Sequence, residues 1–225
     1  MALTNLEHDK GLRVSTLTNL IKSCNLCKEL VRSRSRVVPG YGDLHAEVLY
    51  IGEAPGALGA DITGVPFTRD RSGVFLQKML NRIGMNKADP KCEYPDLMGA
   101  YITNIVRCNP RKKNSTNRTP TKKEIQNCGD YLSKEIEIIN PRIIVTLGVH
   151  ASKSILGKEF KGKDFGKIKK LSKYYVLPLW HPAFVVRGGG RQRINEKKYQ
   201  KYFLKIRKFM SSVDNVKMTL SARTQ

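Results

Sequence analysis

The sequence has no run of apolar residues long enough to cross a bilayer, and residues 1–18 lack the apolar core of a secretion signal. Its five cysteines are an odd number, so complete pairing into disulfides is impossible. These absences favour an intracellular protein with no membrane partner. Cysteines in such a protein are expected to be reduced, bound to metal or catalytic.

Acidic residues are also scarce. The 225 residues include 19 Asp and Glu against 41 Lys and Arg, which gives a formal charge of +22. Because the basic residues are interleaved with Tyr, Phe and Gly, this excess favours a nucleic-acid partner over an anionic membrane, an acidic protein or simply solvated lysines. No cluster of carboxylates suited to Mg²⁺ is present, which argues against a nuclease.

Apolar, β-branched segments alternate with helical patterns along the chain. Strands are predicted over 47–51, 100–106, 143–147 and 174–180, and helices over 72–83, 121–139, 148–156 and from Asn195 onward. This alternation predicts an α/β domain with a central, mainly parallel four-stranded sheet. We expect one domain over residues 1–210, which begins with a polar arm and a short helix, and a flexible C-terminal tail over 211–225.

Polar residues follow several of the predicted strands. Gly52 and Glu53 end the first strand in a Gly/Pro turn, Asn104 lies near the end of the second, and His181 follows the fourth. Since ligands bind at the carboxyl ends of parallel strands, we expect these residues to gather at one edge of the sheet. Taken singly, each is more often structural, as a solvated Glu, a strand-end hydrogen bond or a lone histidine.

Four of the cysteines form a pattern typical of a metal centre. Cys24 and Cys27 form a C-x-x-C pair, and Cys108 and Cys128 flank one basic loop. Four thiolates suit either zinc or an iron–sulfur cluster. A lone C-x-x-C is also compatible with redox chemistry, and the other two residues with ordinary buried thiols. Cys92 is expected to be free.

Several motifs in combination resemble the uracil-DNA glycosylase superfamily, in the family 4 group of its iron–sulfur branch. The resemblance runs from Cys24 to about Arg187. The motifs that carry it are Gly-Glu-Ala-Pro-Gly at 52–56, Thr-Asn-Ile-Val-Arg-Cys-Asn-Pro at 103–110, residues 117–121 with 128–132, and His-Pro-Ala-Phe-Val-Val-Arg at 181–187.

The resemblance implies a three-layer α/β/α fold and a DNA repair enzyme that flips out uracil and hydrolyses its N-glycosidic bond without cutting the strand. It implies a [4Fe-4S] cluster on Cys24, Cys27, Cys108 and Cys128. The expected substrate is uracil-containing DNA, single- or double-stranded. We expect a monomer in the cytoplasm of a prokaryote, associated with the nucleoid, and a sliding clamp is a candidate further partner.

The resemblance also suggests a role for each site residue. Glu53 would activate the attacking water, with Asp70 in reserve, and His181 would donate to the departing base. The residues expected to bind the flipped uracil are Ala54, Phe67 and Asn104. The residues expected to bind DNA phosphates are Arg107, Arg111, Lys112, Lys113 and Arg187.

Other segments are more similar to family 5, which tends to lack the first-motif carboxylate and can accept hypoxanthine or xanthine. Residues 57–60 stand where family 4 carries an acidic cluster, and residues 38–43 and 63–73 look like family 5. The sequence thus leaves open whether Glu53 or Asp70 activates water, and how broad the base range is. A non-catalytic, zinc-containing nucleic-acid-binding protein and another iron–sulfur enzyme of nucleic acids, such as a nuclease, remain as alternatives.

Overall fold

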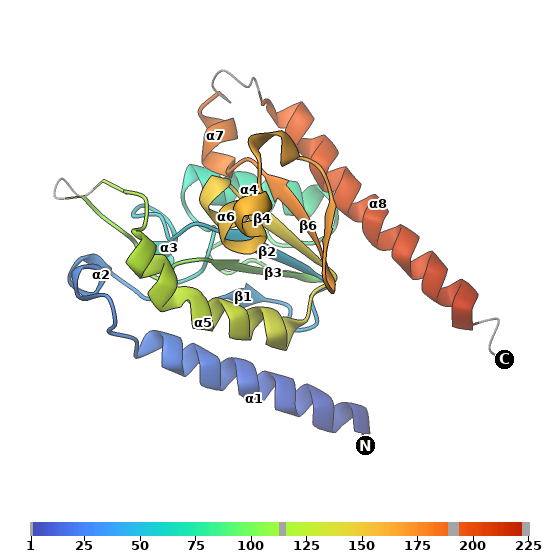
Figure 1. Ribbon diagram of the computed structural model, residues 1–225, viewed down its shortest axis with the longest axis horizontal. Coiled ribbons are helices and arrows are strands. Elements are labelled where there is room, and N and C mark those ends of the chain that lie inside the picture. Colours follow the sequence, from blue (N-terminus) through green and yellow to red (C-terminus); the bar gives the residue numbers. More distant parts are fainter. Residues whose placement is uncertain (1, 113–115, 189–193, 222–225) are drawn as a thin grey trace.

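The computed structural model describes residues 2–112, 116–188 and 194–221 of the chain (Figure 1). In chain order its elements are α1 (Ala2–Lys22), α2 (Lys28–Ser33), β1 (Tyr41–Gly42), β2 (Val48–Gly52), α3 (Ala60–Thr63), α4 (Arg71–Arg82), β3 (Ala100–Asn104), α5 (Lys122–Ile139), β4 (Ile143–Leu147), α6 (Val149–Leu156), η1 (Gly157–Glu159), η2 (Gly162–Asp164), β5 (Lys169–Leu171), β6 (Tyr174–Leu179), α7 (Pro182–Val186) and α8 (Glu196–Ser221).

Six strands form one sheet in the order β1-β3-β2-β4-β6-β5. The four predicted strands are its central ones and run parallel to one another, whereas β1 and β5 pair antiparallel at the two edges. The predicted number of four strands is therefore wrong. The extra strands are a Tyr-Gly pair and the polar segment Lys-Lys-Leu, so neither carries the apolar run that predicts a strand.

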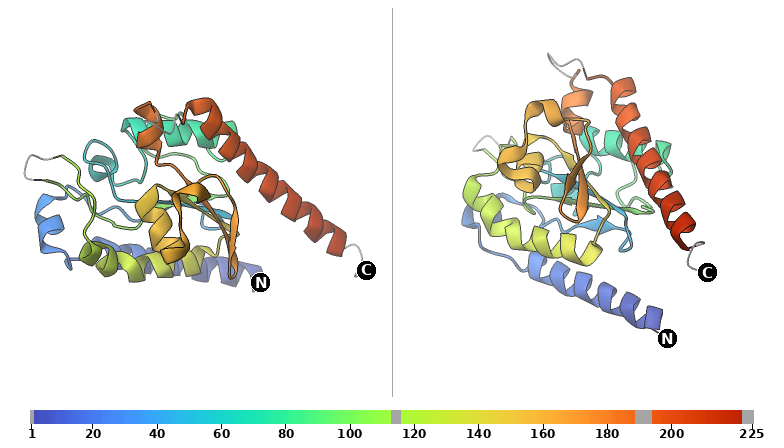
Figure 2. Two further views of the ribbon diagram at one scale, coloured as in Figure 1. Left: turned by 45° about the horizontal axis from the view of Figure 1, so that its top comes forward. Right: turned by 45° about the vertical axis from the view of Figure 1, so that its right-hand side comes forward.

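Helices cover both faces of the sheet, which confirms the α/β class (Figures 1 and 2). On one face, Leu76 of α4 and Phe203 of α8 belong to the same buried cluster as Tyr50 of β2. On the other face, Leu132 of α5 belongs to a cluster with Leu49 of β2. Successive residues of β2 thus serve opposite layers, as the alternation of side chains along a strand requires.

Both ends of the chain are more helical than predicted. Helix α1 spans Ala2–Lys22 and lies alongside α5 in both figures, with Leu17 and Ile21 packed on Ile138. This contact supplies the stability that a helix with a weak amphipathic pattern lacks on its own. Helix α8 continues to Ser221, past the boundary expected at residue 210. No helix in the described part of the chain is both long and apolar enough to span a membrane.

The register of the parallel strands brings their ends to one edge of the sheet. Gly52 of β2 lies beside Asn104 of β3, and Leu147 of β4 lies beside Leu179 of β6. The segments that follow these four strands therefore leave the sheet at the same edge. This edge is the side on which α3 lies in Figure 1, and it is where the sequence places its polar candidates.

Replacement of Leu76 by Ala tests the packing of α4 on the sheet. The side chain is fully buried, so we expect the free energy of unfolding to fall by about 2–5 kcal/mol, the usual cost of removing a buried leucine. Chemical denaturation of the purified protein measures this change. The matched control is Leu204→Ala on α8, where the side chain is 48% exposed and the expected change is within about 0.5 kcal/mol. Equal losses in both variants would contradict the packing described here.

Candidate active site

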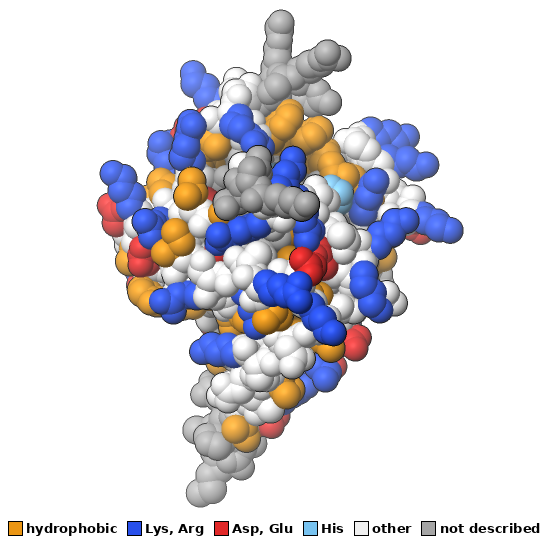
Figure 3. Space-filling model, turned by 90° about the vertical axis from the view of Figure 1, so that its left-hand side faces the viewer, with side chains coloured by type: hydrophobic (Ala, Val, Ile, Leu, Met, Phe, Trp, Pro, Cys, Tyr) orange, Lys and Arg blue, Asp and Glu red, His pale blue; other side chains and the backbone are white. Residues whose placement is uncertain are grey.

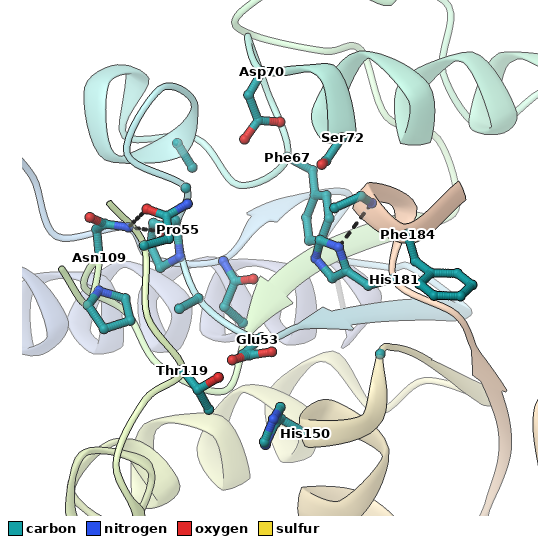
Figure 4. Close-up of a pocket in the computed structure, with 18 of the residues that line it drawn as sticks. Glu53, Pro55, Phe67, Asp70, Ser72, Asn109, Thr119, His150, His181 and Phe184 are labelled. Carbon is teal, nitrogen blue, oxygen red and sulfur yellow. Dashed lines mark hydrogen bonds between the residues drawn. The ribbon is translucent and has the colours of Figure 1, made fainter. Parts of the chain in front are cut away.

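A cavity of about 520 Å³ opens at the carboxyl edge of the parallel strands (Figure 4). Its walls come from the ends of β2, β3, β4 and β6 and from the loops that follow them. Seven of the predicted site residues line it, namely Glu53, Ala54, Phe67, Asp70, Asn104, His181 and Arg187. The sheet edge therefore gathers the residues that the sequence leaves far apart.

The absence of a side chain at Gly52 allows two of these residues to meet. A Cβ atom at this position would overlap Oδ1 of Asn104 and lie 2.5 Å from Cε2 of the Phe67 ring. Only glycine therefore permits the amide and the ring to stand together over the end of β2. This steric need explains the glycine at the start of the Gly-Glu-Ala-Pro-Gly turn.

Phe67 is held in a strained backbone conformation. Its φ of 52° lies in the left-handed region, which costs a bulky residue on the order of 1–3 kcal/mol and recurs at functional sites. Nε2 of Gln77 donates to its carbonyl oxygen at 3.1 Å, and a Cβ at Gly73 would lie 2.6 Å from its carbonyl carbon. The ring faces the imidazole of His181 with centroids 5.6 Å apart (Figure 4). The strain thus fixes an aromatic wall of the pocket.

Asn104 carries an unsatisfied acceptor. The residue is only 2% exposed, and within the described part of the chain its Oδ1 has no hydrogen-bond partner. Such an orphan costs about 1–3 kcal/mol, and native proteins keep few of them. Because the residue lines the cavity, the missing partner is best supplied by a ligand that presents an N–H group.

His181 is a neutral donor with a defined tautomer. Its Nδ1 accepts a hydrogen bond from the backbone N–H of Ala183 at 3.1 Å, so the ring proton stands on Nε2. Burial, and then the positive charge of Arg187, lowers the pKa of His181 to about 4. The imidazole is therefore uncharged at neutral pH and offers one N–H group.

Glu53 occupies the pocket beside Thr119 and His150 (Figure 4). Burial raises the pKa of its carboxyl group, while the charge of His150 and a hydrogen bond from the Thr119 hydroxyl lower it. A carboxylate that is partly desolvated but still supported in its ionised form suits a general base. Glu53 therefore has the surroundings that activation of a water molecule requires.

Asp70 has a structural role as well as a place in the pocket. It is the N-cap of α4, and its Oδ1 accepts the N–H of Gly73 at 2.7 Å. Burial raises the pKa of its carboxyl group, while hydrogen bonds from the N–H groups of Gly73 and Ser72 lower it. In Figure 4 it stands at the far end of the pocket from Glu53. The second carboxylate oxygen of Asp70, Oδ2, lies close to Gly59, where an added Cβ would be 2.7 Å away.

The prediction that Arg107 contacts DNA is wrong. The residue is 1% exposed, and its guanidinium pairs with the buried carboxylate of Glu135 at 2.6 Å. It lies three residues after the end of β3, and its partner Glu135 belongs to α5, so its side chain is held inside the domain. A buried guanidinium cannot reach a phosphate in solution.

The other basic candidates differ in accessibility. Arg187 and Lys112 are exposed, and Arg187 lies at the pocket. Arg111 is partly exposed and pairs with the buried carboxylate of Asp61, whereas Lys113 lies outside the described residues. Figure 3 shows the pocket side of the molecule, on which Lys and Arg side chains predominate over acidic ones. The charge of the surface around the pocket therefore suits a polyanion.

The four cysteines predicted to bind metal come together beside α5. Cys108 and Cys128 are buried, and Cys27 packs on the same core cluster. Cys24 and Cys27 interact electrostatically with Cys108, and Cys27 and Cys108 do so with Cys128. Burial raises the pKa of the Cys128 thiol to about 11. Cys92 is absent from these interactions and donates instead to the carbonyl oxygen of Tyr94.

This set of donors fits a thiolate-bound metal group. Two N–H donors already point at the sulfurs, because Nη1 of Arg34 lies 3.1 Å from Cys108 and Nδ2 of Asn127 lies 3.2 Å from Cys27. Such donors stabilise thiolates around a metal. No three His, Cys, Asp or Glu side chains in the part of the chain described stand in the arrangement of an assembled metal site. The support for a metal group is therefore the chemistry of four thiols near α5 with N–H donors at two of them.

The sequence analysis missed several pocket residues. His150 follows Gly148 at the end of β4 and faces Glu53, and Thr119 bonds to the same carboxylate. Asn117 accepts from the N–H of Ala57 and from Asn109, which ties the basic loop to the turn after β2. Gly148 ends the third predicted strand, so the residues after it, including His150, could have been predicted to lie at the same edge of the sheet. The contacts of Thr119 and Asn117 depend on tertiary packing that no local pattern encodes.

Comparisons with known proteins agree with this geometry. The family described as the Uracil DNA glycosylase superfamily matches residues 39–208. A Type-4 uracil-DNA glycosylase of Archaeoglobus fulgidus is 35% identical over 175 residues, which cover 74% of this chain and 79% of the relative. A Type-5 uracil-DNA glycosylase of Thermus thermophilus is 35% identical over 202 residues, which cover 81% of this chain and 83% of the relative. Since the matched residues contain the whole sheet and the whole lining of the pocket, the chain belongs to the uracil DNA glycosylase superfamily.

Proposed function

We propose that this protein is a DNA repair glycosylase that removes uracil from DNA by hydrolysis of the N-glycosidic bond and leaves an abasic site. The observation that carries the proposal is the orphaned Oδ1 of Asn104, a residue that lines the same cavity as Phe67 and Glu53. Uracil presents an N–H group on the edge that such an amide would read, whereas cytosine presents an acceptor there. A site built to hydrogen-bond one edge rejects the other by leaving buried groups unpaired.

The pocket residues divide the reaction between them. The flipped base stacks on Phe67 and is read by Asn104. As the bond between the sugar C1′ and the base nitrogen breaks, its electron pair moves into the base, and Nε2–H of His181 donates to the oxygen that becomes negative. Glu53 takes a proton from the water that attacks C1′. Arg187 and Lys112 neutralise flanking phosphates, with Lys113 proposed to do the same.

We further propose that Cys24, Cys27, Cys108 and Cys128 hold a [4Fe-4S] cluster. Two relatives at 35% and 34% identity are Type-4 uracil-DNA glycosylases, the type whose resemblance suggested the cluster. Bound there, the cluster would fasten the chain after β3 to α2 and α5. The support from this chain is the gathering of the four sulfurs and the N–H donors aimed at two of them.

Two features bear on the base range. Glu53 supplies the carboxylate that a family 4 reaction needs, while the Type-5 relative of Thermus thermophilus is as similar as the Type-4 relatives. We propose uracil as the chief substrate because Asn104 faces the pocket, with hypoxanthine and xanthine as alternatives. We assign Asp70 to the cap of α4 first and to water activation second. Monomeric state, a sliding-clamp partner and a cytoplasmic, nucleoid-associated location stay predictions.

Product analysis tests the function directly. A single-stranded oligonucleotide with one uracil should yield free uracil and a strand that breaks at that position only after alkali. Asn104→Asp should slow release, because the amide donor becomes an acceptor, and one lost buried contact costs about 1–3 kcal/mol. If the wild-type protein releases no uracil and the oligonucleotide stays intact after alkali, the proposal is overturned. Unchanged release by Asn104→Asp would remove that residue from base recognition. A parallel substrate with hypoxanthine measures the base range.

The pH dependence of single-turnover excision tests the roles of Glu53 and His181. Glu53 must be ionised to act, so the rate should rise with pH through a pKa above the usual 4.5 for a glutamate. Because the pKa of His181 is about 4, its protonation should not lower the excision rate at pH values well above 4. Glu53→Gln should abolish this acid limb, whereas Asp70→Asn should keep it.

Loss of positive charge beside Glu53 extends this test. His150→Asn should move the acid limb to higher pH, because the charge of His150 lowers the pKa of Glu53. His45→Asn is the matched control, since His45 is exposed and away from the pocket, and it should leave the limb in place. If the acid limb is lost in Asp70→Asn but kept in Glu53→Gln, the general base is Asp70 and not Glu53.

Removal of single cysteines tests the metal group. Cys108→Ala and Cys128→Ala should each lower the iron and sulfide content, the visible absorption and the melting temperature, because metal binding contributes folding free energy. Cys92→Ala is the control and should change none of these. Stoichiometric zinc in a colourless wild-type protein would overturn the cluster assignment.

A further inference from the structure

Arg107 is the largest fully buried side chain in the described part of the chain. It lies directly behind Asn104, because its Nη1 donates to the backbone carbonyl of Asn104 and its Nη2 donates to Oε2 of Glu135 at 2.6 Å. Both side chains of this ion pair are nearly inaccessible, at 2% and 4% exposure. The base-reading residue of the pocket is thus tied to a buried charge.

Glu135 makes further hydrogen bonds to the end of β3 and to the chain beside it. Its Oε2 also accepts the hydroxyl of Thr103 at 2.7 Å, and its Oε1 accepts the N–H of Gly40 at 3.0 Å. Thr103 precedes Asn104 on β3, and Arg107 follows three residues later. The residues on both sides of Asn104 are therefore bonded to one carboxylate on α5.

The same helix carries one of the cysteines. Glu135 follows Cys128 by seven residues, which is about two turns, so both lie on one face of α5. The backbone N–H of Arg107 donates to the sulfur of Cys128, and Cys108 is the next residue. The segment that carries Asn104 is therefore fastened to α5 at the ion pair and again at the cysteines.

Stability alone does not account for this pair. Removal of two charges from water costs about as much as their attraction returns, and well-packed apolar residues often serve equally well. Nε of Arg107 even lacks a partner in the described part of the chain. What an apolar pair could not supply is the donor to the Asn104 carbonyl and the acceptor for Thr103.

We propose that Arg107 and Glu135 are positioning residues for base recognition, which hold the end of β3 so that the Asn104 amide faces the pocket and which link that end to the cysteine group. The inference rests on the proposed function, since it gives Asn104 its role as reader of the base. Neither residue touches the substrate. Their effect should therefore fall on the chemical step and not on DNA affinity.

The test compares variants of the full chain purified with its native metal. Glu135→Gln keeps the shape but loses the charge, and we expect the single-turnover rate on uracil-containing DNA to fall about 10²-fold, as small misplacements of catalytic groups do. The DNA dissociation constant should stay within about twofold, because phosphate contacts dominate it. Glu137→Gln is the matched control, two residues along α5, where an exposed carboxylate pairs with Arg13. It should match the wild type.

A double variant separates positioning from stability. Arg107→Met with Glu135→Leu removes both charges together, so the melting temperature should recover relative to Glu135→Gln while the rate stays low. Recovery of the rate along with the melting temperature would overturn the proposal. If the double variant does not fold, Arg107→Lys serves instead. It keeps the charge beside Glu135 but loses the second donor, and a wild-type rate in it would equally overturn the proposal.

Hydrogen exchange distinguishes this proposal from the proposed function. Backbone amides of residues 103–109 should exchange faster in Glu135→Gln and in the double variant, but not in Glu137→Gln. This readout does not depend on excision. If the wild type releases no uracil, the proposed function fails whatever the exchange shows. If the wild type is active and exchange in this segment is unchanged by Glu135→Gln, the positioning role fails alone.

Discussion

The pocket depends on one close approach, that of the Phe67 ring and the Asn104 amide over Gly52. Any side chain there would overlap the amide oxygen and press on the ring, so the aromatic wall of the pocket and the amide beside it would separate. The rest of the site follows from this contact. The register between β2 and β3 puts Gly52 beside Asn104, and the strained turn at Phe67 returns the ring to the same point.

The site contains several features that cost free energy. Asn104 keeps an unpaired acceptor, Phe67 keeps a left-handed backbone, and two carboxyl groups have their pKa raised by burial. Natural sequences break local rules mainly where function requires it. The surrounding layers offset these costs, with both faces of the sheet buried under helices.

The sequence predicted the four central strands and their helices because each carries a strong local pattern, and the strand ends predicted which polar residues meet at one edge of the sheet. It could not predict β1 and β5, whose pairing depends on neighbours supplied by the fold. It misjudged Arg107 for a similar reason. Arginine after a strand in a basic protein suggests a surface residue, and only the approach of Glu135 from α5 makes it buried. Thr119 was missed since its partner lies 66 positions earlier in the chain.

The hydrogen bond from the backbone N–H of Ala183 to Nδ1 of His181 both leaves the ring proton on Nε2 and caps the start of α7. His181 is the N-cap of α7, so a proton on Nδ1 would remove the acceptor that begins this helix. The folded pKa of about 4 lies below the ordinary 6.5, so as pH falls from 6.5 toward 4 an unfolded segment takes up the proton first. The contribution of this cap to stability is therefore fully present above this window and decreases as pH falls through it. Below this window His181 carries a charge and no longer accepts the N–H of Ala183, so the neutral imidazole that offers a proton to the pocket is also the one that caps α7.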